Sequence, residues 1–518
     1  MTEFPNRPDL RHSLAQTHNN FAVLLHTNGR LEEAEKAYGD ALVIWKALAA
    51  DSPSYRSSRQ ELARTHYNLG LVLRDRRRLV EAKAACREAL AIQRPLAGEF
   101  PTVLKYQEDA AGTLKSLASL LRVTGPPEEA EAVWRDALTL YKRLAANFHS
   151  RPDFRQELGR GHFNLGNLLR DTRRSKEAGA AYGDAITIYK RLADDFPGRV
   201  DFRRELAKCH YNLGLLFANN RRPKEAAAAY GDALAIQKQL DPAFPDRADF
   251  LHEMARTQSN LGNVLGRMNR SKEAEAAYGD ALPLLKQLAA NFADRADFRR
   301  DLALTHGNLG NLLRDTRRLK EAEAAYRDAL AIQKPLADDF PTVPHYQNEL
   351  AGTLGNLAFV HHQRGEFAAA VSFLEQARPY SQAALKVVPE HPAYRKVYHN
   401  GLRTLTASCV GLADHARLAT AAEELARFGY DPANDAYTAA RCLSHAVMLA
   451  DKDAKLDEAK RKELAQSYAD RALEQLRQAV ARGYKDAAHM KQDPALEPLR
   501  AREEFRRLLA DLEGKPKE

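Results

Sequence analysis

Hydrophobic residues recur at three- and four-residue spacing along most of the chain. In residues 201–217 such a stripe passes through Leu206, Leu213 and Leu216, which predicts an amphipathic helix. Residues 224–240 carry a second stripe of the same period, and the polar phrase ANNRRP separates the two segments. The pattern therefore predicts two antiparallel helices joined by a short turn, which together form a helical hairpin.

The hairpin pattern returns every 48 residues. The stretch THYNLGLVL at residues 65–73 reappears as CHYNLGLLF at residues 209–217, three periods later. Two columns of the repeat hold Ala in all eight units: Ala34, Ala82, Ala130, Ala178, Ala226, Ala274, Ala322 and Ala370, and Ala41, Ala89, Ala137, Ala185, Ala233, Ala281, Ala329 and Ala377. Small residues let helices approach closely, and a lone hairpin cannot bury its apolar face. We therefore expect the eight hairpins to stack into a solenoid.

These columns resemble the tetratricopeptide repeat, whose pattern runs W-x-x-L-G and later A-x-x-x-F. The matching positions in one unit are His210, Leu213, Gly214, Ala226, Tyr230 and Ala233. The chain departs from the family in its period, 48 residues against about 34 in the common form, and in its His at the aromatic opening position of five units. The resemblance implies an all-α fold, a right-handed superhelical solenoid of antiparallel helical hairpins.

The repeat pattern divides the chain into three predicted parts. Residues 1–378 hold the eight repeats, residues 379–430 read as a degenerate ninth hairpin, and residues 431–518 form a C-terminal helical cap. A charge-rich terminal unit is what a solenoid needs to cover its last apolar face. The tail also resembles those of bacterial serine/threonine protein kinases that carry such repeats. A regulatory or docking module of a kinase signalling system is therefore one alternative function.

Composition and charge narrow the class of protein. With 44% apolar and 28% charged residues the chain is typical of a folded protein. No run of 18 apolar residues is present, and the first residues lack the pattern of a secretory signal. We therefore expect a cytoplasmic protein that does not engage a membrane. The net charge of +9 permits an acidic partner without requiring one.

Catalytic chemistry finds no support in the sequence. A kinase would need a Gly-rich phosphate loop, an H-R-D and a D-F-G, and none is present. The adjacent pair His361 and His362 lacks the further ligands that a metal site requires. A recurring histidine column is expected to pack between helices, and it comprises His18, His66, His162, His210 and His306. We expect no catalytic residue, no metal and no cofactor.

An asparagine column is the candidate binding site. It comprises Asn20, Asn68, Asn164, Asn212, Asn260, Asn308 and Asn356, and Ser116 alone breaks the series. The column lies about 120° from the apolar stripe, so we expect it to be exposed. Asn is a poor helix former, so its recurrence needs another reason. In tetratricopeptide arrays this face lines a concave groove, where similar Asn ladders grip an extended peptide. The alternative is that each Asn bonds its own or the adjoining helix.

Basic residues accompany the asparagines. One turn before them lie Arg64, Arg160, Lys208 and Arg256, and near the end of the same helices lie Arg74, Arg122, Arg170 and Arg314. Such cations could bond an acidic segment or a C-terminal carboxylate. The set near the helix ends could instead be there because the negative end of the helix dipole favours cations. We expect a non-enzymatic scaffold that binds a protein or peptide. RNA binding is a further alternative, but the repeats lack the variation of base-reading side chains that it would use.

Overall fold

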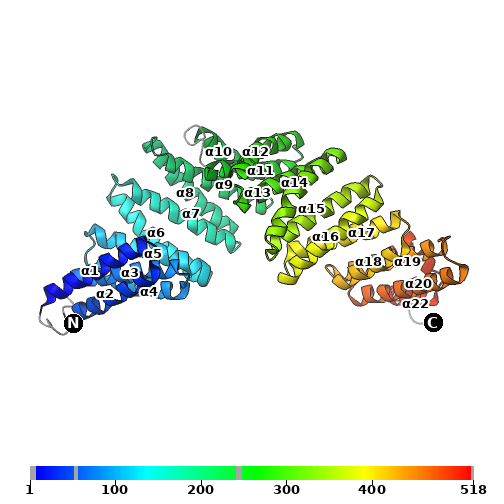
Figure 1. Cartoon of the computed structure of the whole chain (residues 1–518), viewed down its shortest axis with the longest axis horizontal. Coiled ribbons are helices and arrows are strands. Elements are labelled where there is room, and N and C mark those ends of the chain that lie inside the picture. The colour runs from blue at the N-terminus through cyan, green and yellow to red at the C-terminus, as the bar shows by residue number, and fades with distance from the viewer. Residues whose placement is uncertain (1–6, 52–55, 241–247, 515–518) are drawn as a thin grey trace. The chain divides into compact units, whose positions relative to one another are not determined.

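The computed structural model describes residues 7–51, 56–240 and 248–514, in which all regular structure is helical. The helices follow one another as antiparallel pairs, the first and second helices of successive hairpins (Figure 1). The prediction of an all-α solenoid of hairpins is confirmed. Contacts divide the chain into two compact units, unit 1 (Met1–Asp246) and unit 2 (Arg247–Glu518).

Unit 1 holds five hairpins. Its helices are α1 (Pro8–Thr27), α2 (Leu31–Asp51), α3 (Arg56–Asp75), α4 (Leu79–Glu99), α5 (Leu104–Thr124), α6 (Pro127–Asn147), α7 (Pro152–Asp171), α8 (Ser175–Asp195), α9 (Val200–Asn219) and α10 (Pro223–Leu240). Each helix packs on the next one along the chain. In addition α1 contacts α3, α3 contacts α5 and α7 contacts α9.

Unit 2 continues the pattern. Its helices are α11 (Ala248–Arg267), α12 (Ser271–Asn291), α13 (Ala296–Asp315), α14 (Leu319–Asp339), α15 (Pro344–Gln363), α16 (Phe367–Val387), α17 (Pro392–Gly411), α18 (His415–Phe428), α19 (Pro432–Asp451), α20 (Glu458–Ala481), α21 (Ala487–Gln492), η2 (Pro494–Leu499) and α22 (Glu503–Leu512). Here too the first helices of successive hairpins meet, α11 with α13, α13 with α15 and α15 with α17. We call the surface that these first helices share within each unit the first-helix face.

The repeated columns of small residues form the contacts between helices. Both Ala columns are buried in every repeat, and the large rings of the next column fill the space beside them. Those buried rings are Tyr38, Trp134, Tyr182, Tyr230, Tyr278 and Tyr326. One Ala-to-ring spacing, repeated every 48 residues, therefore recurs in the packing of the two helices within these hairpins.

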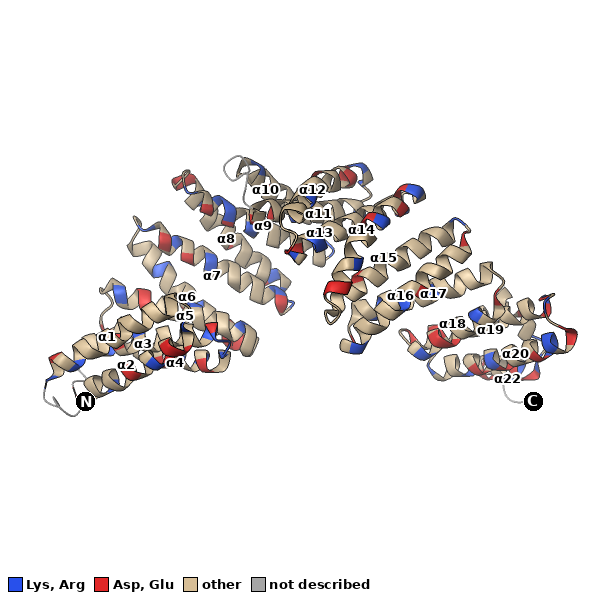
Figure 2. Cartoon of the chain, viewed as in Figure 1, with Lys and Arg blue, Asp and Glu red and all other residues tan. Residues whose placement is uncertain are grey.

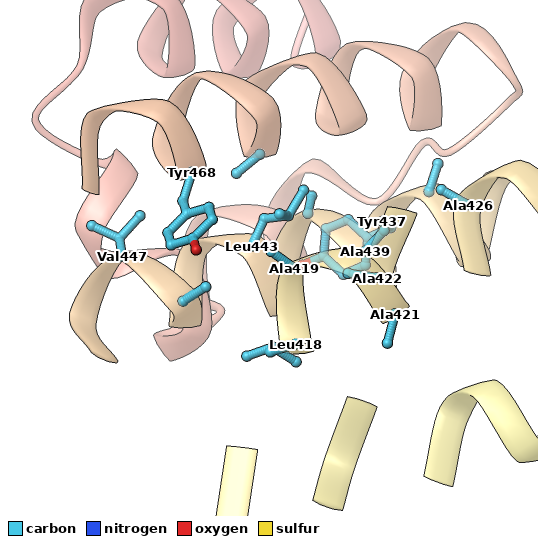
Figure 3. Packing of buried hydrophobic residues seen from close by; sticks show 14 of the residues in the cluster. Leu418, Ala419, Ala421, Ala422, Ala426, Tyr437, Ala439, Leu443, Val447 and Tyr468 are labelled. Carbon is cyan, nitrogen blue, oxygen red and sulfur yellow. The ribbon is translucent and has the colours of Figure 1, made fainter. Parts of the chain in front are cut away.

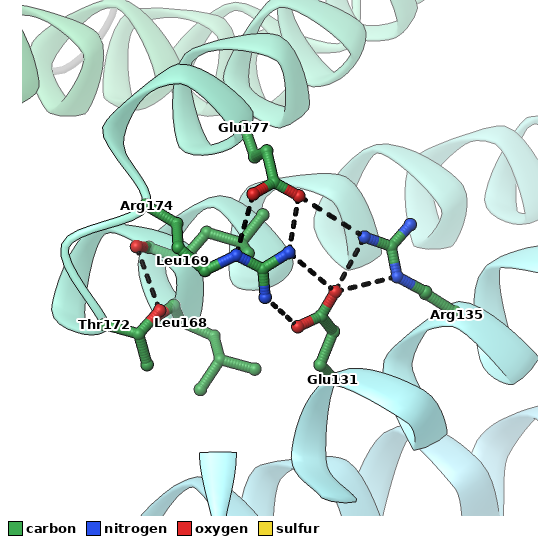
Figure 4. A network of polar contacts seen from close by, with 7 residues as sticks. All are labelled: Glu131, Arg135, Leu168, Leu169, Thr172, Arg174 and Glu177. Carbon is green, nitrogen blue, oxygen red and sulfur yellow. Dashed lines mark hydrogen bonds and ion pairs between the residues drawn. The ribbon is translucent and has the colours of Figure 1, made fainter. Parts of the chain in front are cut away.

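Ion pairs at the turns tie one hairpin to the next. Arg174, which precedes α8, donates to Glu177 in the first turn of that helix (2.7 Å) and also bonds Glu131 of the preceding repeat (Figure 4). Arg135 completes the network on Glu131 (2.7 Å). In unit 2, Arg318 bridges Glu321 and Glu275 in the same way at 2.7 and 2.6 Å. The first-turn Glu is thus held by an Arg beside it, near the positive end of the helix dipole.

The C-terminal part departs from the repeat pattern. Helices α18, α19 and α20 share an Ala-rich core in which Leu418, Leu443 and Tyr468 pack together (Figure 3). Tyr437 stacks on Tyr484 with 4.2 Å between ring centroids and donates to the buried Asp493 at 2.8 Å. This core continues through η2 and α22 without the signature columns. The predicted boundaries at residues 378 and 430 remain predictions.

Candidate peptide-binding face

The asparagine column lies on the first helices, on α1, α3, α7 and α9 of unit 1 and on α11, α13 and α15 of unit 2. The expectation that the column is exposed is correct for Asn20 alone, because the other six asparagines are half-buried. The first-helix face therefore holds amides that are sheltered but still reach the surface.

At least three of the asparagines are hydrogen-bonded within the protein, and one of them is Asn68, which bonds the Tyr38 hydroxyl of the preceding repeat. Asn212 donates to the carbonyl of Lys208 (2.9 Å) and accepts from Nη1 of Arg170 in the preceding repeat (3.1 Å). Asn356 likewise accepts from Nη1 of Arg314 (3.3 Å). At these positions the alternative interpretation applies, since the amide joins its own helix to the adjoining one.

Two other asparagines retain free amides. Asn164 on α7 and Asn308 on α13 are half-buried, and neither has a hydrogen-bond partner within residues 7–51, 56–240 and 248–514. One amide offers both a donor and an acceptor, which matches the N–H and C=O of a peptide backbone. Asn164 and Asn308 are consequently the members of the column best suited to a ligand.

The predicted cations are paired with acids that the sequence analysis overlooked. Arg64 pairs with Glu61 (2.5 Å), and the same i,i+3 pair recurs at Arg160, with Glu157 (3.1 Å). The remaining pairs are Lys208 with Glu205 (3.3 Å) and Arg256 with Asp301 (3.5 Å). A column of acids at the same 48-residue period was the available signal, and it comprises Glu61, Asp109, Glu157, Glu205, Glu253, Asp301 and Glu349. The first-helix face is thus close to balanced in charge at these positions.

The later arginine set is also engaged. Arg74, Arg170 and Arg314 each bond the aspartate that follows them, at 2.9, 3.0 and 2.8 Å. Arg122 lies 3.8 Å from Asp171 of the next repeat. Charges of both signs are spread over the helices of each unit (Figure 2). These arginines are therefore paired with aspartates of the protein and are not free to bind a ligand without breaking those pairs.

The histidine column packs between helices, as expected. His66 and His306 are buried, and burial lowers the pKa of each. Nδ1 of His306 lies 3.5 Å from Oδ2 of Asp328, which raises that pKa by less than burial lowers it. His162 and His210 are half-buried, and burial lowers their pKa values as well. Histidines so placed are typical of packing rather than of proton transfer.

The cysteines have thiols whose pKa is raised by burial. Burial raises the pKa of the Cys86 and Cys442 thiols to about 11 and that of Cys409 to about 12. A thiol with so high a pKa is a poor nucleophile. Within the described residues no group of three His, Cys, Asp or Glu side chains could hold a metal ion. Among the helices of the same residues, none has the length and apolar character of a membrane span.

The chain is similar to known proteins of the tetratricopeptide repeat type. The family model described as tetratricopeptide repeat matches residues 14–54, 61–100, 254–289, 302–335 and 350–393. No curated protein sequence matches the chain. Among solved structures, BtubC from P. vanneervenii is 22% identical, with 50% of this chain and 92% of that chain covered and a TM-score of 0.38.

Two further solved structures are similar to this chain. PilF from Pseudomonas aeruginosa is 16% identical, with 54% of this chain and 94% of that chain covered and a TM-score of 0.32. The second is a signal transduction ATPase with numerous domains and a tetratricopeptide repeat sensor, from Pyrococcus horikoshii. It is 12% identical, with 77% of this chain and 54% of that chain covered and a TM-score of 0.40.

Proposed function

We propose that this chain, whose repeats match the tetratricopeptide repeat model and support a protein-interaction scaffold, binds extended segments of a partner protein along the first-helix face of each unit, without catalysis. The observation that carries this proposal is the pair of half-buried amides of Asn164 and Asn308, which no described residue satisfies. A polar group that is partly withdrawn from water gains most from a partner of matching geometry. A peptide backbone supplies that partner at regular intervals.

The charge of the partner follows less directly. An acidic residue or a C-terminal carboxylate would be attracted to Arg64, Arg160, Lys208 and Arg256, but each of these already pairs with an acid. A ligand carboxylate must therefore displace an intramolecular one, and the net gain is small at an exposed site. We propose that these cations orient an acidic partner more than they tighten its binding.

The two alternative functions receive less support. Binding of RNA draws on unpaired cations that neutralise phosphates, and the predicted cations of this face are neutralised by Glu and Asp side chains. The resemblance to kinase tails is supported by neither the family match nor the solved structures. We therefore keep the peptide-binding scaffold as the single proposed function.

Paired double variants test the proposal. A partner is first captured from lysate with and without nuclease, and its affinity is then measured for Asn164→Ala with Asn308→Ala and for Asn212→Ala with Asn356→Ala. We expect the first double variant to weaken binding roughly 5- to 150-fold, the equivalent of two hydrogen bonds. Its stability should not fall, because Ala is the better helix former. The second should lower the free energy of unfolding, since it removes bonds to Arg170 and Arg314. Unchanged affinity in the first double variant contradicts the proposal.

A further inference from the structure

A hollow opens on the first-helix face of unit 2, between α15 and α17 and beside the C-terminal end of α13. Its volume is about 820 Å³. Three glycines line it, Gly352 and Gly355 from α15 and Gly401 from α17. A Cβ added to Gly355 would meet no atom within 4 Å. The hollow therefore exists because side chains are missing from two facing helices.

Comparison between repeats shows which side chains are absent around the hollow. In unit 1 the column of Gly355 carries a large ring in three of its five repeats, at Tyr67, Phe163 and Tyr211, whereas unit 2 has Ser259 and Gly307 there. The column of Gly352 carries the cations Arg64, Arg160, Lys208 and Arg256. The repeat of α15 thus has glycine in both columns, which leaves neither a ring nor a cation at this surface.

A smaller cavity that is lined in part by leucines adjoins the hollow. Leu374 stands in the column that holds Tyr or Trp in six other repeats. A second cavity of about 30 Å³ lies next to Leu374 and Leu402, and it shares Gly355, Val397 and Gly401 with the hollow. A flat apolar group that entered between the two glycines would therefore continue toward leucine side chains.

One wall of the hollow is aromatic. Phe359 stands in the column where Asn167, Asn263 and Asn311 accept the tyrosine hydroxyls of their repeats at 2.8, 2.7 and 2.7 Å. With Leu374 in place of the tyrosine, that hydroxyl is absent, and the column position holds a ring that lines the hollow. The guanidinium carbon of Arg314 lies 5.7 Å from the centroid of Phe359. Such a wall offers stacking to a second ring.

The rim of the hollow is positively charged. Three arginines line it, Arg314, Arg317 and Arg403, against one acid, Asp315. Asp315 is taken by Arg314 at 2.8 Å. Arg317 and Arg403 are exposed and form no ion pair with any residue that the structure describes. In this respect they differ from the cations one turn before the asparagines, which are paired with acids.

We propose that this hollow binds a bulky aromatic side chain of the partner segment whose neighbouring residues are acidic. The ring covers the glycine backbone and stacks on Phe359, and the adjacent carboxylate accepts from Arg403 or Arg317. This inference rests on the proposed function and names the side chains that the first-helix face selects.

Three labelled peptides and one variant, Gly355→Phe, whose added ring fills the hollow, test the inference. The probes are acetyl-Gly-Ser-Glu-Trp-Glu-Ser-Gly-amide and its matched Glu-Ala-Glu and Gln-Trp-Gln forms, measured by fluorescence anisotropy with the whole chain. We expect the Glu-Trp-Glu peptide to bind at least about 10-fold more tightly than either control peptide, as burial of a large ring and a charge-assisted bond imply. In Gly355→Phe this preference should disappear.

Matched variants separate filling from unfolding. Gly307 occupies the same column one repeat earlier, also has open space at its Cβ, and does not line the hollow. Gly307→Phe should therefore bind the Glu-Trp-Glu peptide as the native chain does, and both Phe variants should keep its denaturation midpoint. In Arg403→Gln the Glu-Trp-Glu and Gln-Trp-Gln peptides should bind more nearly alike.

Several results would overturn the inference. They are equal binding of the three peptides, binding of none, an unaltered preference in Gly355→Phe, or an equal loss in Gly307→Phe. The scaffold function itself is tested separately, by the captured partner and the asparagine variants. A negative peptide result therefore refutes the aromatic and acidic selectivity of the hollow and leaves that other test standing.

Discussion

Gly214 on α9 lies so close to Tyr230 on α10 that a Cβ at Gly214 would come 2.7 Å from the ring. The same approach recurs where Gly166, Gly262 and Gly310 face the tyrosines of their own repeats. Because each ring lies against the backbone of the first helix, only the ring separates the two helices of a hairpin at this point. This contact sets the spacing of the hairpin and explains why the column holds only Gly or Ala.

The hairpin contact predicts opposite effects for two glycines of one repeat. Gly214→Ala should lower the free energy of unfolding by about 1–2 kcal/mol, since the added methyl must displace the Tyr230 ring. Gly231→Ala should raise it by up to about 1 kcal/mol, because a Cβ there meets no atom within 4 Å and Ala favours the helix. Urea denaturation of both variants checks the pair. Equal shifts of the same sign would show that the ring does not constrain Gly214.

The alanine columns predict intolerance to larger side chains. Ala226 and Ala233 are fully buried, so Ala226→Leu or Ala233→Leu should destabilise the chain by about 1–3 kcal/mol. Ala228→Leu is the matched control, since Ala228 is exposed on the same helix and should change stability little. The measurement is the midpoint of chemical denaturation. An unchanged midpoint for both buried variants would refute close packing at these columns.

Backbone strain at the hairpin turns predicts a stabilising change. Arg221 has φ 57°, a left-handed conformation that glycine adopts at the corresponding positions Gly29 and Gly365. Arg221→Gly should therefore stabilise the chain by about 1 kcal/mol, because the Cβ penalty of that conformation disappears. Arg221→Ala retains a Cβ and should bring no such gain. Thermal or urea denaturation of the two variants side by side decides the point, and an equal gain in both would indicate a charge effect instead.

The buried histidines predict a loss of stability in mild acid. Burial and Lys286 lower the pKa of His306, and Asp328 offsets them only in part, so the unfolded chain takes up a proton before the folded one does. This contribution is intact above about pH 6.5 and is lost as the pH falls below it, by at most about 1.4 kcal/mol per pH unit for each such histidine. His306→Gln, which copies Gln258 in the same column, should reduce the difference in unfolding free energy between pH 7.5 and pH 5.5. An unchanged difference would assign the acid sensitivity to other groups.

The sequence by itself determined the helical hairpins and the contacts within them. A helix places every third or fourth residue on one face, so the columns of Ala, Gly and Tyr record which residues meet, and their 48-residue period records that this packing recurs from one hairpin to another. The sequence also singled out the asparagine column. Its recurrence at a position that favours other residues was visible without coordinates.

Only the tertiary structure decided which of those asparagines can serve a ligand. Asn212 is satisfied by Arg170, 42 residues earlier, whereas Asn164 occupies the same column and has no partner among the described residues. Whether a hydrogen bond forms depends on differences of a few tenths of an ångström in the distance between side chains of different repeats. A sequence column does not carry that information. The hollow at Gly355 has the same origin, because an empty position becomes a cavity only when the facing helix also lacks a side chain, as it does at Gly401.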